Sequence, residues 1–183
     1  MNFIKGYDPE TLREVVDPSQ CRERLEEIEE QRSLPALLER VWLLKMLDRL
    51  EEARALSEES VRVARMAGTR KDLLRARVLH ATVLQHQGAH EAAAQELDAC
   101  ATEAEGKGWA NLAAFACQHQ GRNLYDAGDF EAAREAFKRS LFLRHGAGAE
   151  DRRIETALLA IDAAERRRDL EPVAPGASVG GAV

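Results

Sequence analysis

Along most of the chain, apolar residues recur every three or four positions and charged residues fill the intervals, a pattern typical of amphipathic helices. Helix breakers divide this pattern into segments. Residues 36–171 contain no proline, so the breaks within them fall at the few glycine positions. The gaps between the breakers predict a series of helices. The expected helices span residues 34–47, 50–66, 70–86, 89–105, 109–126, 129–144 and 150–168.

The two ends of the chain depart from this series. Apolar residues at helical spacing within residues 19–32 predict an amphipathic helix that covers the first helical pair. The first 17 residues are expected to hold at most a short helical turn around Glu10–Val16, and we expect no β-strand. Residues 172–183 lack charge and periodicity, which predicts a flexible tail that is dispensable for folding.

The breakers also repeat with a fixed period. Asp48, Gly88 and Gly128 lie 40 residues apart, and each precedes a Glu-Ala pair at the start of a new helix. Such a period indicates a repeat array in which every unit buries its apolar face against its neighbours. The sequence therefore predicts an all-α superhelix, a solenoid of about three helical hairpins with terminal capping helices. Its expected parts are an N-terminal segment with a capping helix (1–33), repeats over about 34–68, 74–108 and 114–148, a capping helix (150–168) and a tail (169–183).

One unit resembles a known motif. In residues 114–145, Gly121 takes the place of the small residue in the first helix of a tetratricopeptide (TPR) unit, and Ala133 that of the second helix. Gly128-Asp129-Phe130 matches the turn between them. The period of 40 residues is similar to that of TPR-like proteins with longer helices, and the resemblance covers roughly residues 34–168. Independently of the family, small residues at these places predict that two helices cross closely there.

Composition agrees with an all-α fold. Ala, Leu, Glu and Arg (31, 22, 22 and 21 residues) make up about half of the 183-residue chain, whereas Val, Ile and Thr together number only 19. Neither a stretch of 18 apolar residues nor a signal peptide is present, and Arg outnumbers Lys 21 to 5, a bias found in bacteria with GC-rich genomes. Cys21, Cys100 and Cys117 are widely spaced, so we expect buried thiols in a bacterial cytoplasmic protein rather than a disulfide framework.

Charge and motifs exclude several classes of function. The net charge of −6 argues against a nucleic-acid partner, which requires a concentrated basic surface. Gly106-Lys107-Gly108 lacks the other residues of a phosphate-binding loop, so we expect no nucleotide cofactor. His86 and His90 have a ligand-like spacing, but Gly88 places a turn between them, so no metal site is expected. We therefore expect a protein that is not an enzyme.

The TPR resemblance implies that one face of each first helix lines a concave groove. On the central unit, Arg122 is expected to be exposed in this groove, because burial of an unpaired guanidinium is costly, with Asp162 as a candidate partner. A place in the core is an equally good interpretation for Trp42 and Phe115. The candidate partner-binding residues, chosen by helical spacing, are Leu38, Trp42, Lys45, Arg75, Val78, Thr82, Gln85, Phe115, Gln118, Arg122, Tyr125 and Asp162.

These observations favour a module that binds a peptide or helix of a partner protein in the groove, with an acidic segment as the candidate ligand. Exchange of Arg122 for Glu is then expected to weaken partner binding while the fold stays intact. A regulatory or sensor protein of the bacterial TPR type, or a fragment of one, is the alternative, and an enzyme of unknown type is a weaker one. We expect neither a nucleic acid nor a membrane as a partner, and a homo-oligomer stays open.

Overall fold

The computed structural model describes residues 3–170, so the expected flexible tail lies outside the described residues. The all-α expectation is confirmed, and the helices from residue 34 onward begin and end within two residues of the expected bounds. None of the described helices combines the length and the apolar character needed to cross a bilayer. The elements are β1 (Ile4–Tyr7), β2 (Glu14–Val16), α1 (Pro18–Glu27), α2 (Leu34–Met46), α3 (Leu50–Ala67), α4 (Arg70–His86), α5 (His90–Gly106), α6 (Ala110–Asp126), α7 (Phe130–Gly146) and α8 (Asp151–Leu170).

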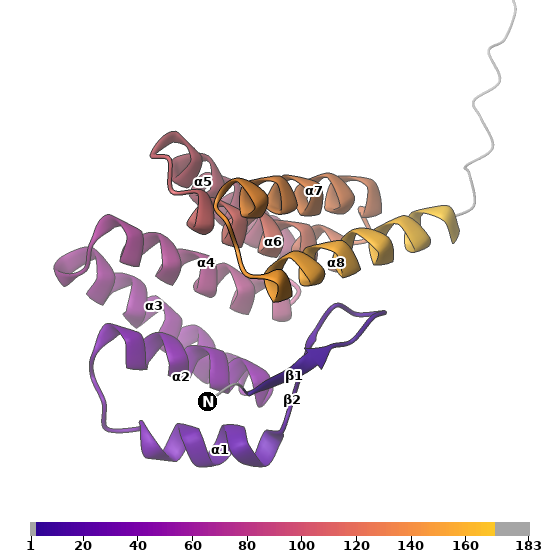
Figure 1. The fold of residues 1–183 in the computed structure, drawn as a ribbon. Coiled ribbons are helices and arrows are strands. Elements are labelled where there is room, and N and C mark those ends of the chain that lie inside the picture. Colours follow the sequence, from indigo (N-terminus) through magenta and orange to yellow (C-terminus); the bar gives the residue numbers. More distant parts are fainter. Residues whose placement is uncertain (1–2, 171–183) are drawn as a thin grey trace, which may run out of the picture.

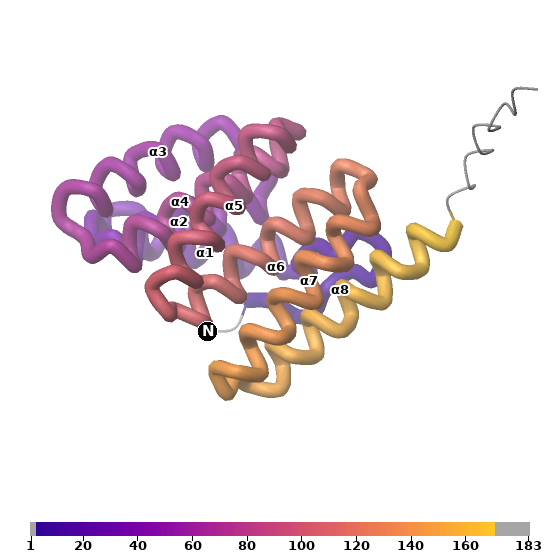
Figure 2. Tube along the Cα trace, turned by 90° about the horizontal axis from the view of Figure 1, so that it is seen from above, coloured from indigo at the N-terminus to yellow at the C-terminus, as the bar shows by residue number. Residues whose placement is uncertain are grey.

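The helices stack in the order of the sequence. From α2 to α7, each helix packs against the helix before it and the helix after it, and α8 packs against α7, as Figures 1 and 2 show. In addition, α4 contacts both α2 and α6, so the first helices of successive pairs lie side by side. This arrangement gives the molecule one surface formed by α2, α4 and α6, and the candidate groove lies on it.

The 40-residue period is present in the backbone. Asp48, Gly88 and Gly128 all adopt left-handed conformations, with φ of 58°, 78° and 86°. After each of them, the next backbone N–H donates to a carbonyl oxygen five residues earlier in the preceding helix, which is a standard way to end a helix. These three bonds, each 2.9 Å long, join Arg49 to Leu44, Ala89 to Leu84 and Asp129 to Leu124.

The N-terminal segment forms a β-hairpin, so the expectation of a helical turn there and of no strand is wrong. Strands β1 and β2 pair antiparallel, with Tyr7 opposite Glu14 and an irregularity between Ile4 and Gly6. The Asp8 carboxylate accepts hydrogen bonds from backbone N–H groups in the connecting loop and fixes its first turn. In Figure 1 the hairpin extends from α1 and α2 toward α8 across the surface of the array.

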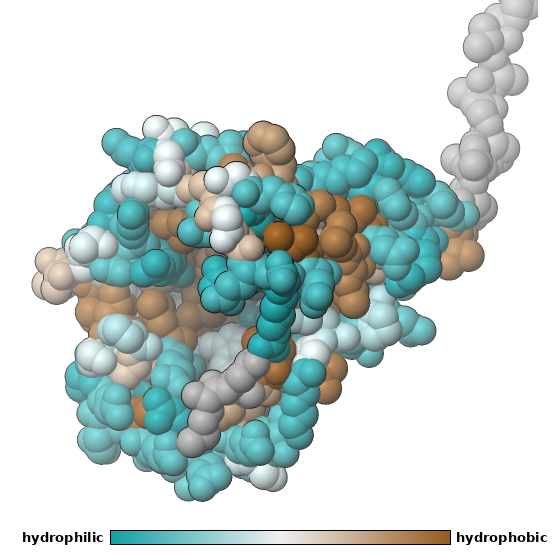
Figure 3. Space-filling view, in the orientation of Figure 1, coloured by the Kyte–Doolittle hydropathy of each residue, from teal (hydrophilic) through white to brown (hydrophobic). Residues whose placement is uncertain are grey.

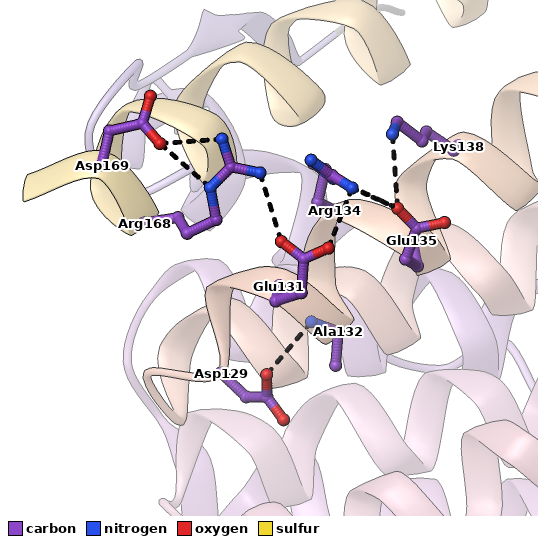
Figure 4. A network of polar contacts seen from close by, with 8 residues as sticks. All are labelled: Asp129, Glu131, Ala132, Arg134, Glu135, Lys138, Arg168 and Asp169. Carbon is purple, nitrogen blue, oxygen red and sulfur yellow. Dashed lines mark hydrogen bonds and ion pairs between the residues drawn. The ribbon is translucent and has the colours of Figure 1, made fainter. Parts of the chain in front are cut away.

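Helix α8 closes the other end of the array. Arg168 of α8 pairs with Glu131 of α7 at 3.2 Å, and Glu131 also pairs with Arg134 on its own helix (Figure 4). Asp129 accepts a hydrogen bond from the Ala132 N–H and so caps α7. Because the charged members of this network are largely solvent-exposed, each pair contributes little. The buried alanines of α8, Ala157, Ala160, Ala163 and Ala164, provide its packing face.

The close crossing expected at Gly121 is present between α6 and α7. A Cβ atom at Gly121 would lie 2.4 Å from Cε1 of Phe137, whose side chain is completely buried. Ala133, the other small residue of this unit, is completely buried as well. The missing side chain therefore permits the contact between the two helices.

We expect Gly121→Ala to lower the free energy of unfolding by about 1–3 kcal/mol, because the added Cβ atom would overlap the completely buried Phe137 ring. Thermal and urea unfolding measure the change. Gly106→Ala is the matched control, since a Cβ atom there meets no atom within 4 Å. Equal stability of the two variants would contradict the described helix crossing.

Candidate functional site

A cavity of about 520 Å³ opens on the surface formed by the first helices. Its walls come from α2, α4 and α6, the start of α8, one residue of α7 and the N-terminal hairpin. Figure 3 shows hydrophobic side chains gathered around a hollow between these elements. The volume falls within the range of about 300–1,000 Å³ that is usual for ligand pockets.

One part of the cavity wall is apolar and aromatic. Trp42 of α2 lies beside Phe3, with ring centroids 6.2 Å apart. Phe115 of α6 is 38% exposed and meets the His119 ring edge-on at 4.6 Å. The other apolar lining residues are Ile4, Tyr7, Leu38, Leu79, Leu112 and Ala114. This surface can hold apolar side chains of a ligand.

The remaining part of the wall is strongly basic. Five cationic side chains line the cavity, namely Lys45, Arg75, Arg122, Arg144 and Arg153, and Glu14 is the acidic side chain among the described lining residues. The chain as a whole carries a net charge of −6. Positive charge is thus concentrated in the cavity, where partly apolar walls strengthen its field.

Glu14 and Arg122, which both line the cavity, form an ion pair. Glu14 Oε1 accepts from Arg122 Nη1 at 2.9 Å, and the two side chains are only 8% and 10% exposed. Burial by itself raises the pKa of Glu14, but the nearby charges of Lys45 and Arg122 outweigh burial and hold this pKa well below its ordinary value. The Arg122 guanidinium also lies 4.9 Å from the centre of the Tyr7 ring. Glu14 is therefore ionised in the folded protein.

The neighbouring basic groups are buried with incomplete charge compensation. Lys45 Nζ donates to Thr82 Oγ1 at 3.3 Å, and burial lowers the Lys45 pKa although Glu14 opposes this shift. Burial also lowers the pKa of His119 far below its ordinary value and that of His86 to about 3, so both imidazoles are neutral near pH 7. The excess of positive charge in the site therefore comes from Lys and Arg side chains and not from protonated histidines.

The positive charges of Arg122 and Arg153 repel that of Arg144 on α7. Burial, together with the charges of Arg122 and Arg153, lowers the Arg144 pKa to about 10. Its guanidinium donates to the backbone carbonyl of Arg153 at the start of α8. An anion placed among these groups would reduce the repulsion.

The structure brings seven of the twelve candidate residues together around the cavity. These are Leu38, Trp42, Lys45, Arg75, Phe115, Gln118 and Arg122. Gln85 and Tyr125 line a smaller recess beside the hairpin, while Val78 and Thr82 are buried within the packed helices. Helical spacing therefore placed seven of the twelve residues on the helix faces that line the cavity.

The expected environment of Arg122 is wrong. Arg122 is buried, and its partner is Glu14 of the hairpin, whereas Asp162 is exposed and pairs with Arg166 on its own helix. Helical periodicity placed Arg122 on the concave side correctly but could not show that the hairpin covers it. The exchange Arg122→Glu, expected from the sequence to leave the fold intact, would place two carboxylates together and destabilise the packed hairpin.

Sequence reasoning missed the residues that the hairpin contributes to the cavity. Ile4, Tyr7 and Glu14 line it, as do Asn111, His119, Arg144 and Arg153 of the helices. Local sequence could have indicated the hairpin, because Ile4, Tyr7, Val15 and Val16 have strong strand propensity and lie on either side of an Asp8-Pro9 turn. All three cysteines are buried and free, in agreement with the expectation for Cys21, Cys100 and Cys117.

Comparisons with known proteins place the fold and do not assign a family. No protein-family model matches the chain, and no curated protein matches it. Among solved structures, the crystal structure of BtubC (BKLC) from P. vanneervenii is similar, with a TM-score of 0.54 and 15% sequence identity. The match covers 90% of this chain and 78% of that chain. At this identity the likeness shows a shared helical fold alone.

We expect Glu14→Gln to lower the free energy of unfolding by up to about 3–5 kcal/mol near neutral pH, since Arg122 loses its buried counter-charge. The folded-state pKa of Glu14 lies below its unfolded-state value of about 4.3, so the carboxylate stabilises the protein fully above that pH. Below it, this contribution falls by about 1.4 kcal/mol per pH unit.

The difference between wild type and variant should therefore shrink as urea titrations move from about pH 6 to about pH 3. Glu10→Gln removes an exposed carboxylate from the same hairpin and is the control. A difference that stays constant over this range would contradict the buried ion pair.

Proposed function

We propose that this protein is a non-catalytic interaction module that binds a segment of a partner protein in the concave cavity. The segment combines acidic groups with apolar side chains. The observation that carries the proposal is the composition of the cavity, in which five cations and one carboxylate stand beside an aromatic wall. Carboxylates form charge-assisted hydrogen bonds to guanidinium groups, and these are stronger than neutral ones.

The mutual repulsion of the cations supports an anionic ligand. Arg122, Arg144 and Arg153 are close enough for their charges to lower the pKa of Arg144, while Glu14 provides one carboxylate for the group. A carboxylate from a partner would add the missing counter-charge. Its binding would then gain electrostatic energy from the guanidinium groups that Glu14 leaves without a counter-charge.

The rim of the cavity supports a protein partner. Arg75, with a side chain that is 59% exposed, and Phe115 stand at the accessible edge, and Trp42 lies further along the wall. Arginine and aromatic residues are enriched among the side chains that dominate protein interfaces. The TPR resemblance also leads us to expect partner binding on the concave side.

We further propose a cytoplasmic location, which the buried free thiols support.

The proposal predicts that the double variant Arg75→Glu/Arg153→Glu binds an acidic probe at least tenfold more weakly than wild type, about 1.4 kcal/mol. The probe is a fluorescent peptide that repeats the unit Leu-Leu-Glu-Glu, and its reference is the same peptide with Gln in place of Glu. Both substituted side chains are exposed, so the helices should keep their stability. Fluorescence anisotropy measures the affinity.

A second readout locates the bound peptide. The chain has two tryptophans, so in a Trp109→Phe background Trp42 alone reports on the cavity wall. The control is Arg62→Glu/Arg65→Glu, which makes the same change of net charge on the exposed face of α3. Equal loss of affinity in the two double variants would mean that the peptide responds only to overall charge, and the proposed site would be rejected.

A further inference from the structure

The hairpin lies on the concave surface with the contacts that a bound peptide would make. Leu12, in its connecting loop, is almost completely buried in a cluster with Tyr125, Phe130 and Phe137. Two residues further on, Glu14 forms the ion pair with Arg122. The Tyr125 hydroxyl donates to a backbone carbonyl of the same segment at 2.7 Å. An apolar side chain, a carboxylate and a backbone oxygen thus dock at three separate points.

The strands of the hairpin add contacts of their own, since Arg152 Nη2 donates to the Ile4 carbonyl oxygen at 3.0 Å and Phe3 lies beside Trp42. The residues of β1 and β2 are all half-buried or exposed. Arg13, between the two anchors, points away from the core and pairs with Asp126 at 2.9 Å with a 45% exposed side chain. The pattern that the concave surface recognises in its own chain is therefore an aliphatic residue and an acidic residue separated by one position.

Both anchors are imperfect. Glu14 contacts Arg122 through Nη1, and Arg122 Nε is buried with no hydrogen-bond partner among the described residues. A guanidinium can instead hold a carboxylate through two parallel bonds. Leu12 has a φ of 57°, a left-handed conformation that is unfavourable for a residue with a side chain. A segment that made the same contacts in an extended conformation, with both guanidinium bonds, would bind better than the hairpin does.

We propose that the hairpin is an internal ligand, and that the partner is an extended segment with an aliphatic residue two positions before an acidic one. In the complex these two side chains replace Leu12 and Glu14. This inference rests on the proposed function and adds to it the sequence pattern of the partner and the displacement of the hairpin. Because the hairpin is tethered, its effective concentration is high, and an outside segment competes only when its contacts are better or the hairpin is loosened.

The chain itself supplies the probe for this idea. A fluorescent peptide with the sequence of residues Phe3–Asp17 is titrated into three full-length proteins, namely wild type, Leu12→Ala and Glu14→Gln, and anisotropy measures binding. We expect at least tenfold tighter binding to the two variants than to wild type, because their own hairpins dock less firmly. Two variants are used since either one alone could perturb the array, and circular dichroism verifies that each keeps the wild-type helicity.

A matched pair of probes tests the carboxylate. The peptide with Gln at the position of Glu14 should bind the Leu12→Ala protein at least tenfold more weakly than the parent peptide. The peptide with Gln at the position of Glu10, an exposed residue in the same loop, makes the same change of charge and should bind as the parent does. Equal binding of all three peptides would overturn the inference, as would a lack of binding to both folded variants.

Two results separate this inference from the proposed function. If the Glu-Leu peptide binds wild type through Arg75 and Arg153 while the hairpin peptide binds neither variant, the internal-ligand inference alone is rejected. If the hairpin peptide binds the variants and the Glu-Leu peptide does not bind wild type, the concave surface accepts its own hairpin sequence but no outside acidic segment, and the proposed function is rejected. Light scattering would detect dimers of the Leu12→Ala protein. If such dimers form and the hairpin peptide dissociates them, the occupant is a second copy of this chain, and the inference of a segment from a different protein is overturned.

Discussion

The arrangement of the concave side depends on the burial of one guanidinium. Arg122 stands on the central first helix, where it is packed among Lys45, His119 and the Tyr7 ring. A buried cation without a counter-charge costs several kcal/mol, and the charged helix side chains that line the cavity with Arg122 are cations. The carboxylate that pairs with Arg122 comes from outside the helical array, because Glu14 belongs to the N-terminal hairpin. This pairing holds the hairpin on the concave side, where Ile4, Tyr7 and Glu14 form part of the cavity wall.

The cavity combines two kinds of recognition that are usually weak by themselves. Its cations attract any anion at long range, and its aromatic wall favours any apolar group. Because basic and aromatic residues line the same hollow, a ligand gains both contributions only if its charged and apolar groups have the matching spacing. The net negative charge of the rest of the chain weakens the approach of other anions to other surfaces.

The sequence was sufficient for the helices and insufficient for the hairpin, for physical reasons. The turns at Gly88 and Gly128 depend on backbone conformations that glycine adopts easily, so local sequence marks them, and Asp48 completes the period although it is not a glycine. Helical spacing then placed Trp42, Lys45 and Arg122 on one face. The ion pair of Arg122 joins residues 108 positions apart, and no local pattern indicates which carboxylate reaches it. Val78 and Thr82 are buried because neighbouring helices and the Lys45 amine cover them, which is equally non-local.

The hairpin also has a consequence for how the array can evolve. Repeat proteins commonly change length by duplication or loss of whole units, because each unit contacts only its neighbours. Here the hairpin begins beside Trp42 of the first unit and ends its loop in the core around Tyr125 and Phe137 of the last. A strand advances only about 3.3 Å per residue, so the span of this short segment is fixed. The hairpin therefore fixes the number of helical units between Trp42 and Arg122, because a unit gained or lost between them would separate Glu14 from Arg122.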